Sequence, residues 1–231
     1  MRRRHKIVMS AVAVMVPLAG WFVLVPPAAA GVAPVDNSQD TVVCTTVTKG
    51  IIKASPPLVI PGAAVPTTLS ISGTLGGCSS PSRPSLVFPE GKSKFKGTIT
   101  GTTDSCTALA GPTTGTGTIT FSWGATDTGT GGTGGGLAQK TSTLSLPTGG
   151  AVGGTFTSPT QPAAQYGQFV IGTANGVGAA PAVSGGFQGG DGGATSAATV
   201  VTTQSIGTAL SFCVGKGIKQ LNMGTGAIAL Q

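Results

Sequence analysis

The side chains capable of acid–base or nucleophilic catalysis are few and widely spaced. The chain of 231 residues has one histidine, His5, and six acidic residues. The acidic residues are Asp36, Asp40, Glu90, Asp104, Asp127 and Asp191. Two carboxylates that flank a glycosidic bond can hydrolyse it, and folding can bring distant carboxylates together, but nothing in this spacing favours such a pair.

Residues 1–30 have the composition of a secretory signal peptide. A basic start precedes an apolar run over 7–25 and three consecutive alanines that end at Ala30. We expect cleavage after Ala30, export by the general secretory route, and a product that is secreted or held at the cell surface. The alternative is an uncleaved anchor, because the apolar run approaches the roughly 20 residues that span a membrane as a helix.

Cleavage would change the chemistry that the chain can perform. It would remove His5, and with it Ser-His-Asp or Cys-His catalysis and histidine metal ligation. Four of the thirteen basic residues but none of the six acidic residues would also leave, so the net charge becomes +3. Lys92, Lys94 and Lys96 remain as a local cluster, and alternate lysines are typical of a solvent-facing strand. We therefore expect no enzymatic activity, no cofactor and no nucleic-acid partner, since nucleic-acid binding needs a basic stripe, usually with stacking aromatic residues.

The four cysteines predict two disulfide bonds, because an exported chain with an even number of cysteines usually oxidises them. Three pairings are possible. If the first two predicted strands form a hairpin, Cys44 lies opposite or nearly opposite Cys78, which leaves Cys106 to pair with Cys213. The alternative pairs Cys44 with Cys213 and Cys78 with Cys106.

Apolar residues recur with a two-residue period, which predicts β-strands. The pattern is clearest over 94–101 and 118–123, where one face is apolar and the other carries Lys, Thr and Ser. Similar segments recur at 41–53, 67–77, 140–146, 151–157, 166–171, 182–187, 197–203, 218–223 and 227–230.

These strands favour one all-β domain over 41–231, preceded by a flexible lead over 31–40. At this spacing, about nine or ten short antiparallel strands would form a β-sandwich or a closed β-barrel, with glycine-rich loops between them.

Four stretches interrupt the strand pattern. Prolines between Pro56 and Pro66 exclude a central strand there, because proline cannot donate to the ladder. Residues 104–111 predict one helical turn with Asp104 as its N-cap. Residues 124–136 predict a mobile surface loop, and residues 206–212 predict a short helix that delivers Cys213.

Two aromatic residues are candidates for ligand stacking. Trp123 shares its strand face with Ile119 and Phe121, so we assign it to the core. Tyr166 remains as the candidate ligand-binding residue. Asp191 lies in a glycine-rich run, but a single carboxylate there predicts a loop and not a calcium repeat.

Four segments, 73–78, 95–106, 117–123 and 215–221, resemble a family of uncharacterised secreted all-β proteins of actinobacteria. The first three match the motifs GTLxGC, FKGTxTGTxxSC and GTxTxxW, in that order. This resemblance implies export, a β fold and two disulfides, and it supplies no catalytic residues.

The sequence therefore favours an exported, non-enzymatic structural or binding protein of the cell envelope or the extracellular space. The alternative is a β-sandwich that binds envelope glycan or lipid through Tyr166 and the glycine-rich loops. An outer-envelope β-barrel pore is less favoured, because membrane strands need about 9–11 residues with an apolar lipid-facing row, and several predicted strands are shorter.

Overall fold

The computed structural model describes residues 34, 36–59, 65–104, 112–129, 135–155, 166–172, 180–205 and 212–231. All of its strands belong to the unit Val32–Gln231. They are β1 (Val42–Leu58), β2 (Val65–Ser79), β3 (Leu86–Val87), β4 (Ser93–Asp104), β5 (Pro112–Ser122), β6 (Thr126–Asp127), β7 (Gly135–Gly136), β8 (Thr141–Thr155), β9 (Tyr166–Gly172), β10 (Ala182–Gly185), β11 (Ala197–Ser205) and β12 (Ile218–Leu230). The predicted signal peptide lies outside the described residues. Within the described part, no helix has the length and apolar character needed to cross a membrane.

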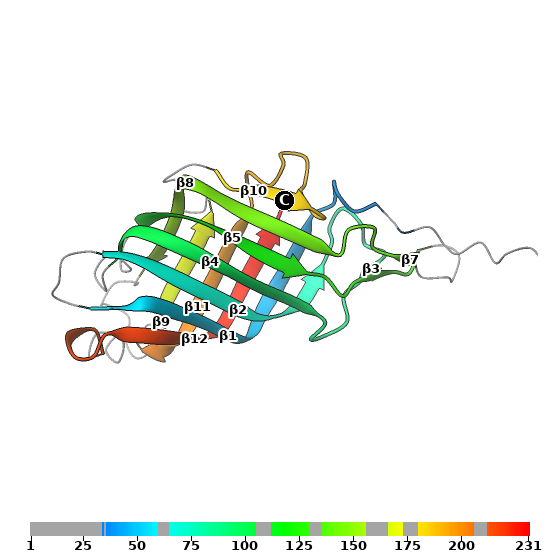
Figure 1. The fold of residues 1–231 in the computed structure, drawn as a ribbon. Coiled ribbons are helices and arrows are strands. Elements are labelled where there is room, and N and C mark those ends of the chain that lie inside the picture. The colour runs from blue at the N-terminus through cyan, green and yellow to red at the C-terminus, as the bar shows by residue number, and fades with distance from the viewer. Residues whose placement is uncertain are drawn as a thin grey trace, which may run out of the picture. The chain divides into compact units, whose positions relative to one another are not determined.

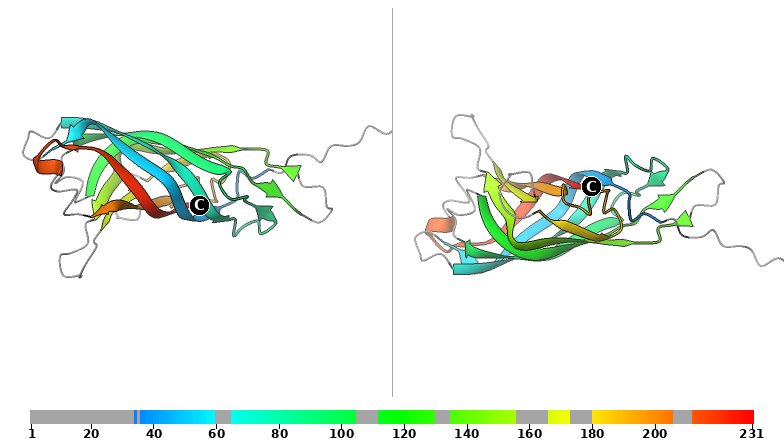
Figure 2. Two further views of the ribbon diagram at one scale, coloured as in Figure 1. Left: turned by 90° about the horizontal axis from the view of Figure 1, so that it is seen from below. Right: turned by 90° about the horizontal axis from the view of Figure 1, so that it is seen from above.

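Nine strands form one antiparallel sheet in the order β10-β8-β5-β4-β2-β1-β12-β11-β9. The sheet curls, so that β4 and β5 lie on one side and β11 and β12 on the other (Figures 1 and 2). β10 pairs with the first part of β8, at Ser142–Ser145, and β9 pairs with its last part, at Val152–Thr155. Both ends of the sheet order thus meet on β8. A second sheet, β3-β6-β7, has three short strands.

The predicted two-residue period is confirmed in the central strands. On β4, Phe95 and Ile99 are buried, whereas Lys94, Lys96 and Thr98 are exposed. The same alternation runs along β2 and β5. Burial of one apolar row from each strand supplies the main stabilising free energy of such a sheet, at about 25 cal/mol per Å² of apolar surface.

One end of the curled sheet is packed with aromatic rings. The ring centroid of Trp123 lies 5.1 Å from that of Phe187, 5.6 Å from that of Phe121 and 6.2 Å from that of Phe88. Trp123 is buried, and its indole Nε1 donates a hydrogen bond to Ser142 Oγ at 2.7 Å. Its predicted place in the core is confirmed.

The predicted hairpin is also confirmed. β1 and β2 pair antiparallel with Cys44 directly opposite Cys78, and these two residues form a disulfide bond. Cys213 is buried and is itself disulfide-bonded. Cys106, its predicted partner, lies outside the described residues, so that pairing stays a prediction.

The expectation of short strands is wrong for several strands of the main sheet. β1 has 17 residues, and β2 and β8 have 15 each. The exclusion of a central strand at Pro56 and Pro57 is also wrong, because β1 lies between β2 and β12 and extends through both prolines to Leu58. Its pairing with β2 stops at Ser55, and its pairing with β12 resumes at Leu58. These prolines therefore occupy a stretch without ladder partners, where a missing N–H costs nothing.

Two segments that the sequence predicted to be mobile are held in place over the residues that the structure describes, 36–40 of the lead and 124–129 with 135–136 of the loop. In the lead, Asn37 and Asp40 are buried, and the backbone N–H of Phe187 donates to the carbonyl oxygen of Asn37 at 2.8 Å. The segment 124–136 contains β6 and β7, with Ala125 and Asp127 buried. Both are fixed by contacts with segments distant in the sequence, which local composition does not encode.

Two further expectations fall partly outside the described residues. Asp104 ends β4, where it pairs with Val65, but the helical turn predicted after it is not described. Of the short helix predicted over 206–212, the structure describes residue 212 alone. That residue begins a single helical turn, 212–214, which contains Cys213.

We predict that Gly97→Ala destabilises the protein by about 1–3 kcal/mol, because overpacking a close backbone contact forces strands apart. A Cβ at Gly97 would collide with the carbonyl oxygen of Thr118 and lie 2.7 Å from Ile119 Cα. Urea unfolding measures the change. Gly190→Ala is the matched control, since a Cβ there meets nothing within 4 Å. Equal unfolding midpoints for the two variants would contradict this account of β4 and β5.

Candidate functional site

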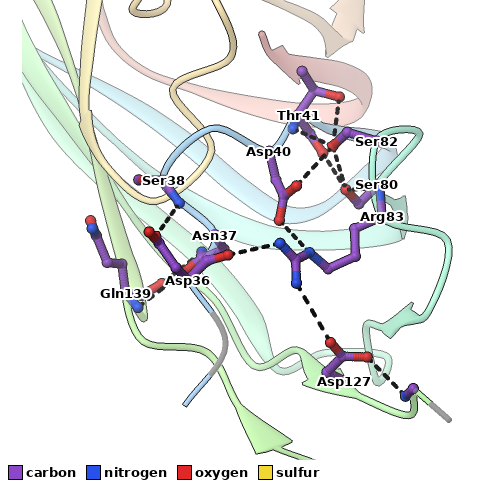
Figure 3. Close-up of polar contacts among 11 residues, drawn as sticks. Asp36, Asn37, Ser38, Asp40, Thr41, Ser80, Ser82, Arg83, Asp127 and Gln139 are labelled. Carbon is purple, nitrogen blue, oxygen red and sulfur yellow. Dashed lines mark hydrogen bonds and ion pairs between the residues drawn. The ribbon is translucent and has the colours of Figure 1, made fainter. Parts of the chain in front are cut away.

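A group of charged residues surrounds Arg83, in the turn between β2 and β3 (Figure 3). Its Nε donates to Asp40 Oδ2 at 2.7 Å, and its Nη2 donates to the carbonyl oxygen of Asp36 at 2.8 Å. Its Nη1 lies 3.8 Å from Asp127 Oδ2. One guanidinium thus joins the segment before β1 to the strand β6.

Hydroxyl and amide groups complete this Arg83 network. Ser82 Oγ donates to Asp40 Oδ1 at 3.3 Å and accepts from the backbone N–H of Thr41 at 2.8 Å. Asn37 Nδ2 donates to the carbonyl oxygen of Gln139 at 2.9 Å, and the N–H of Gln139 donates back to Asn37 Oδ1 at 3.0 Å (Figure 3).

Two carboxylates of this network are held ionised. A hydrogen bond from the Ser85 side chain, another from the Gly129 N–H and the charge of Arg83 lower the pKa of Asp127. Hydrogen bonds from the backbone and side chain of Ser38 lower the pKa of Asp36. A general acid needs the opposite shift, so these carboxylates are suited to holding segments together.

The Asp191 carboxylate accepts hydrogen bonds from the backbone of its own loop. Its Oδ1 accepts from the N–H groups of Gly193 and Ala194, at 2.9 and 3.1 Å, and its Oδ2 accepts from the N–H of Thr195 at 3.0 Å. The hydrogen bond from the Thr195 side chain is the largest of the effects that lower the Asp191 pKa. Among the residues that the structure describes, no three His, Cys, Asp or Glu residues are grouped to hold a metal ion.

The outer face of β1, β2, β4 and β5 carries a groove of about 470 Å³. Its lining combines two lysines with five hydroxyl side chains and contains no acidic residue among the residues described there. The lining residues are Ile51, Lys53, Ser70, Ile71, Ser72, Lys96, Gly97, Thr98, Thr118 and Thr120. We call this the lysine–hydroxyl groove.

Strand register builds the groove from two rows that cross the sheet. In one row Lys53 lies opposite Ser70, which lies opposite Thr98. In the next row Ser72 lies opposite Lys96, which lies opposite Thr120. Cross-strand neighbours on one face have Cβ atoms about 5 Å apart, so these rows form a continuous polar surface.

The candidate residues of the sequence analysis fall in different places. Lys94 and Lys96 are both exposed, and Lys96 lines the groove. Tyr166 begins β9, which borders β8 and β11, whereas the groove crosses β1, β2, β4 and β5. The Tyr166 side chain lies outside what the structure describes, so its ligand-binding role stays a prediction.

Sequence reasoning missed Lys53 as a partner of Lys96. The two residues lie 43 positions apart, and each is one polar member of an alternating strand. The hairpin register inferred from Cys44 and Cys78 would place Lys53 opposite Leu69, and a register shift between Thr48 and Ile51 moves it opposite Ser70. No local pattern encodes that shift.

Searches of protein-family models, curated proteins and solved structures find no match to this chain.

We predict that Asp127→Asn lowers the stability of the protein at neutral pH and has less effect in acid. The folded-state pKa of Asp127 is lowered, so its ionised form stabilises the fold above the unfolded value near 4. This contribution decreases as the pH falls from about 5 towards the lowered pKa. Urea unfolding at pH 7 and pH 3 measures the difference between the two proteins.

Glu90→Gln is the matched control, because Glu90 is an exposed carboxylate in the turn before β4. A difference between Asp127→Asn and the parent protein that widens in acid would refute the assignment.

Proposed function

We propose that the protein is an exported, non-enzymatic binding module that holds an acidic polysaccharide of the cell envelope in the lysine–hydroxyl groove. The observation that carries this proposal is the combination of two ammonium groups and five hydroxyls in one groove whose described lining has no carboxylate. Its physical basis is complementarity in both charge and hydrogen bonding.

Each kind of side chain contributes a different interaction. Ser and Thr hydroxyls both donate and accept hydrogen bonds, as sugar hydroxyls do. Lys53 and Lys96 are compact positive charges that suit the carboxylate or phosphate groups of an acidic glycan. Both lysines are exposed, so salt will screen their contribution and the affinity will fall as ionic strength rises.

Two features support export without catalysis. The basic start, apolar run and alanine triplet of residues 1–30 have the order of a signal peptide, and the Cys44–Cys78 disulfide suits an oxidising compartment. Asp36, Asp127 and Asp191 are engaged in hydrogen bonds that keep them ionised.

We further infer that the curled sheet is a closed, water-facing barrel. Its eight strands would be β1, β2, β4, β5, β8, β9, β11 and β12, each paired with the next and β12 paired with β1. Several strands exceed the length that a membrane barrel needs, so length does not argue against the alternative of a pore. The described side chains of β4 do argue against it, because its apolar row faces inward and its lysines and threonines face outward.

We predict that the double variant Lys53→Gln, Lys96→Gln binds an acidic polysaccharide, tested with polygalacturonate, roughly tenfold or more weakly than the parent protein. Loss of two charges from one groove removes both ionic contacts. Isothermal titration calorimetry measures the affinity at two salt concentrations, and dextran serves as the neutral glycan.

The matched control is Lys92→Gln, Lys140→Gln, which removes the same charge from exposed residues that do not line the groove. Equal losses in the two double variants would show non-specific attraction, and an absence of binding by the parent protein would refute the proposal. Tyr166→Ala in the same assay tests the role predicted for that ring.

A further inference from the structure

The turn that leads into β12 exposes two large apolar side chains. Phe212 is 52% exposed and Val214 is 71% exposed. Cys213 lies between them, is 2% exposed and is disulfide-bonded. Because Cys213 is anchored in the interior, its two neighbours are held on the outside of the same turn.

Backbone hydrogen bonds give this turn a defined shape. The N–H groups of Gly215 and Gly217 both donate to the carbonyl oxygen of Phe212, at 3.2 and 2.8 Å. Gly217 has a φ of 78°, which glycine adopts without the strain that a side chain would bring. The exposed apolar residues therefore belong to an ordered turn.

The end of β1 adds a third apolar side chain. Leu58 lies opposite Ile218, and Val59, which follows Leu58, is 37% exposed. A Cβ built on Gly217 would lie 2.8 Å from Val59 Cγ1, so Val59 borders the turn. We call Val59, Phe212 and Val214 the apolar tip.

Two lysines flank the apolar tip. Lys216 and Lys219 are exposed and line, together with Phe212, a groove of about 280 Å³. The carboxylates whose side chains are described lie near the opposite ends of the strands. Asp36 and Asp40 precede β1, Asp127 contacts Arg83, Glu90 precedes β4, and Asp191 precedes β11. Asp104 ends β4, which lies two strands from β1, and the structure does not describe the Asp104 side chain.

We propose that the apolar tip docks this end of the protein on an anionic lipid bilayer. Exposed apolar side chains flanked by lysines are typical of surfaces that insert into the headgroup region of a bilayer. There the apolar groups leave water, and the ammonium groups approach lipid phosphates. A neutral protein partner would not need the two lysines, which is why the charge pattern favours an anionic surface. This inference uses residues outside the lysine–hydroxyl groove and does not depend on it.

Vesicle co-sedimentation of the secreted product tests the proposal. We expect binding to vesicles of phosphatidylglycerol and phosphatidylcholine and little binding to phosphatidylcholine alone. The double variant Phe212→Ser, Val214→Ser should bind the anionic vesicles roughly tenfold or more weakly, and Lys216→Gln, Lys219→Gln should lose a similar factor at low salt. Circular dichroism and thermal melting verify that each variant folds.

Matched controls come from the opposite end of the strands. Val87, on β3, is 47% exposed, so Val87→Ser removes exposed apolar surface away from the apolar tip, and Lys92→Gln, Lys94→Gln removes the same charge as the lysine variant. Both controls should bind like the parent protein. Lys53→Gln, Lys96→Gln should also bind vesicles normally, which separates this test from that of the glycan groove.

A second measurement does not depend on loss of binding. A Phe212→Trp variant should show a blue shift of its added fluorescence with anionic vesicles, whereas a Val87→Trp variant should show none. Equal binding to both kinds of vesicle, or unchanged binding by the Phe212→Ser, Val214→Ser variant, would overturn the proposal. Concentration-dependent dimers that this variant abolishes, without vesicle binding, would overturn it in favour of a second copy of the chain.

Discussion

The architecture depends on the register with which β-strands present alternate residues to opposite faces of one curled sheet. Because the side-chain period is two, a slip of one residue would turn Phe95 and Ile99 outward and bring Lys94, Lys96 and Thr98 into the core. The cost of burying those charges and hydroxyls makes the register strongly preferred. The same register lines up the outward residues in rows, so core packing and surface chemistry arise from one constraint.

The two ends of the strands differ in the contacts that their connecting segments make. At one end, the Arg83 network and the aromatic rings packed around Trp123 tie together segments that lie between strands. At the other end, Phe212 and Val214 remain exposed beside lysines. Charged and aromatic contacts thus hold one end together, whereas the other end keeps exposed apolar side chains, which is the basis of the proposed membrane contact.

Comparison with the sequence analysis shows where local patterns suffice. Trp123 was assigned to the core from its strand neighbours, and Cys44 was placed opposite Cys78 from hairpin geometry, and both are as predicted. Asn37 was assigned to a flexible lead that contains Pro and Gly, and Asp127 to a mobile loop made almost entirely of Gly, Thr, Ala and Asp. Both are buried through contacts with Gln139 and Arg83, which lie 102 and 44 residues away.

The sequence by itself determined the all-β class and the faces of the central strands, because these follow from a period of two. It favoured the Cys44–Cys78 disulfide from pairing between adjacent strands, and the structure decided between that pairing and its alternative. Only the tertiary structure decided that Lys53 joins Lys96 in one groove, that Arg83 reaches Asp40, and that Val59 borders the turn of Phe212. Such contacts depend on how the whole sheet curls and on the summed register of several strands. No local segment carries that information.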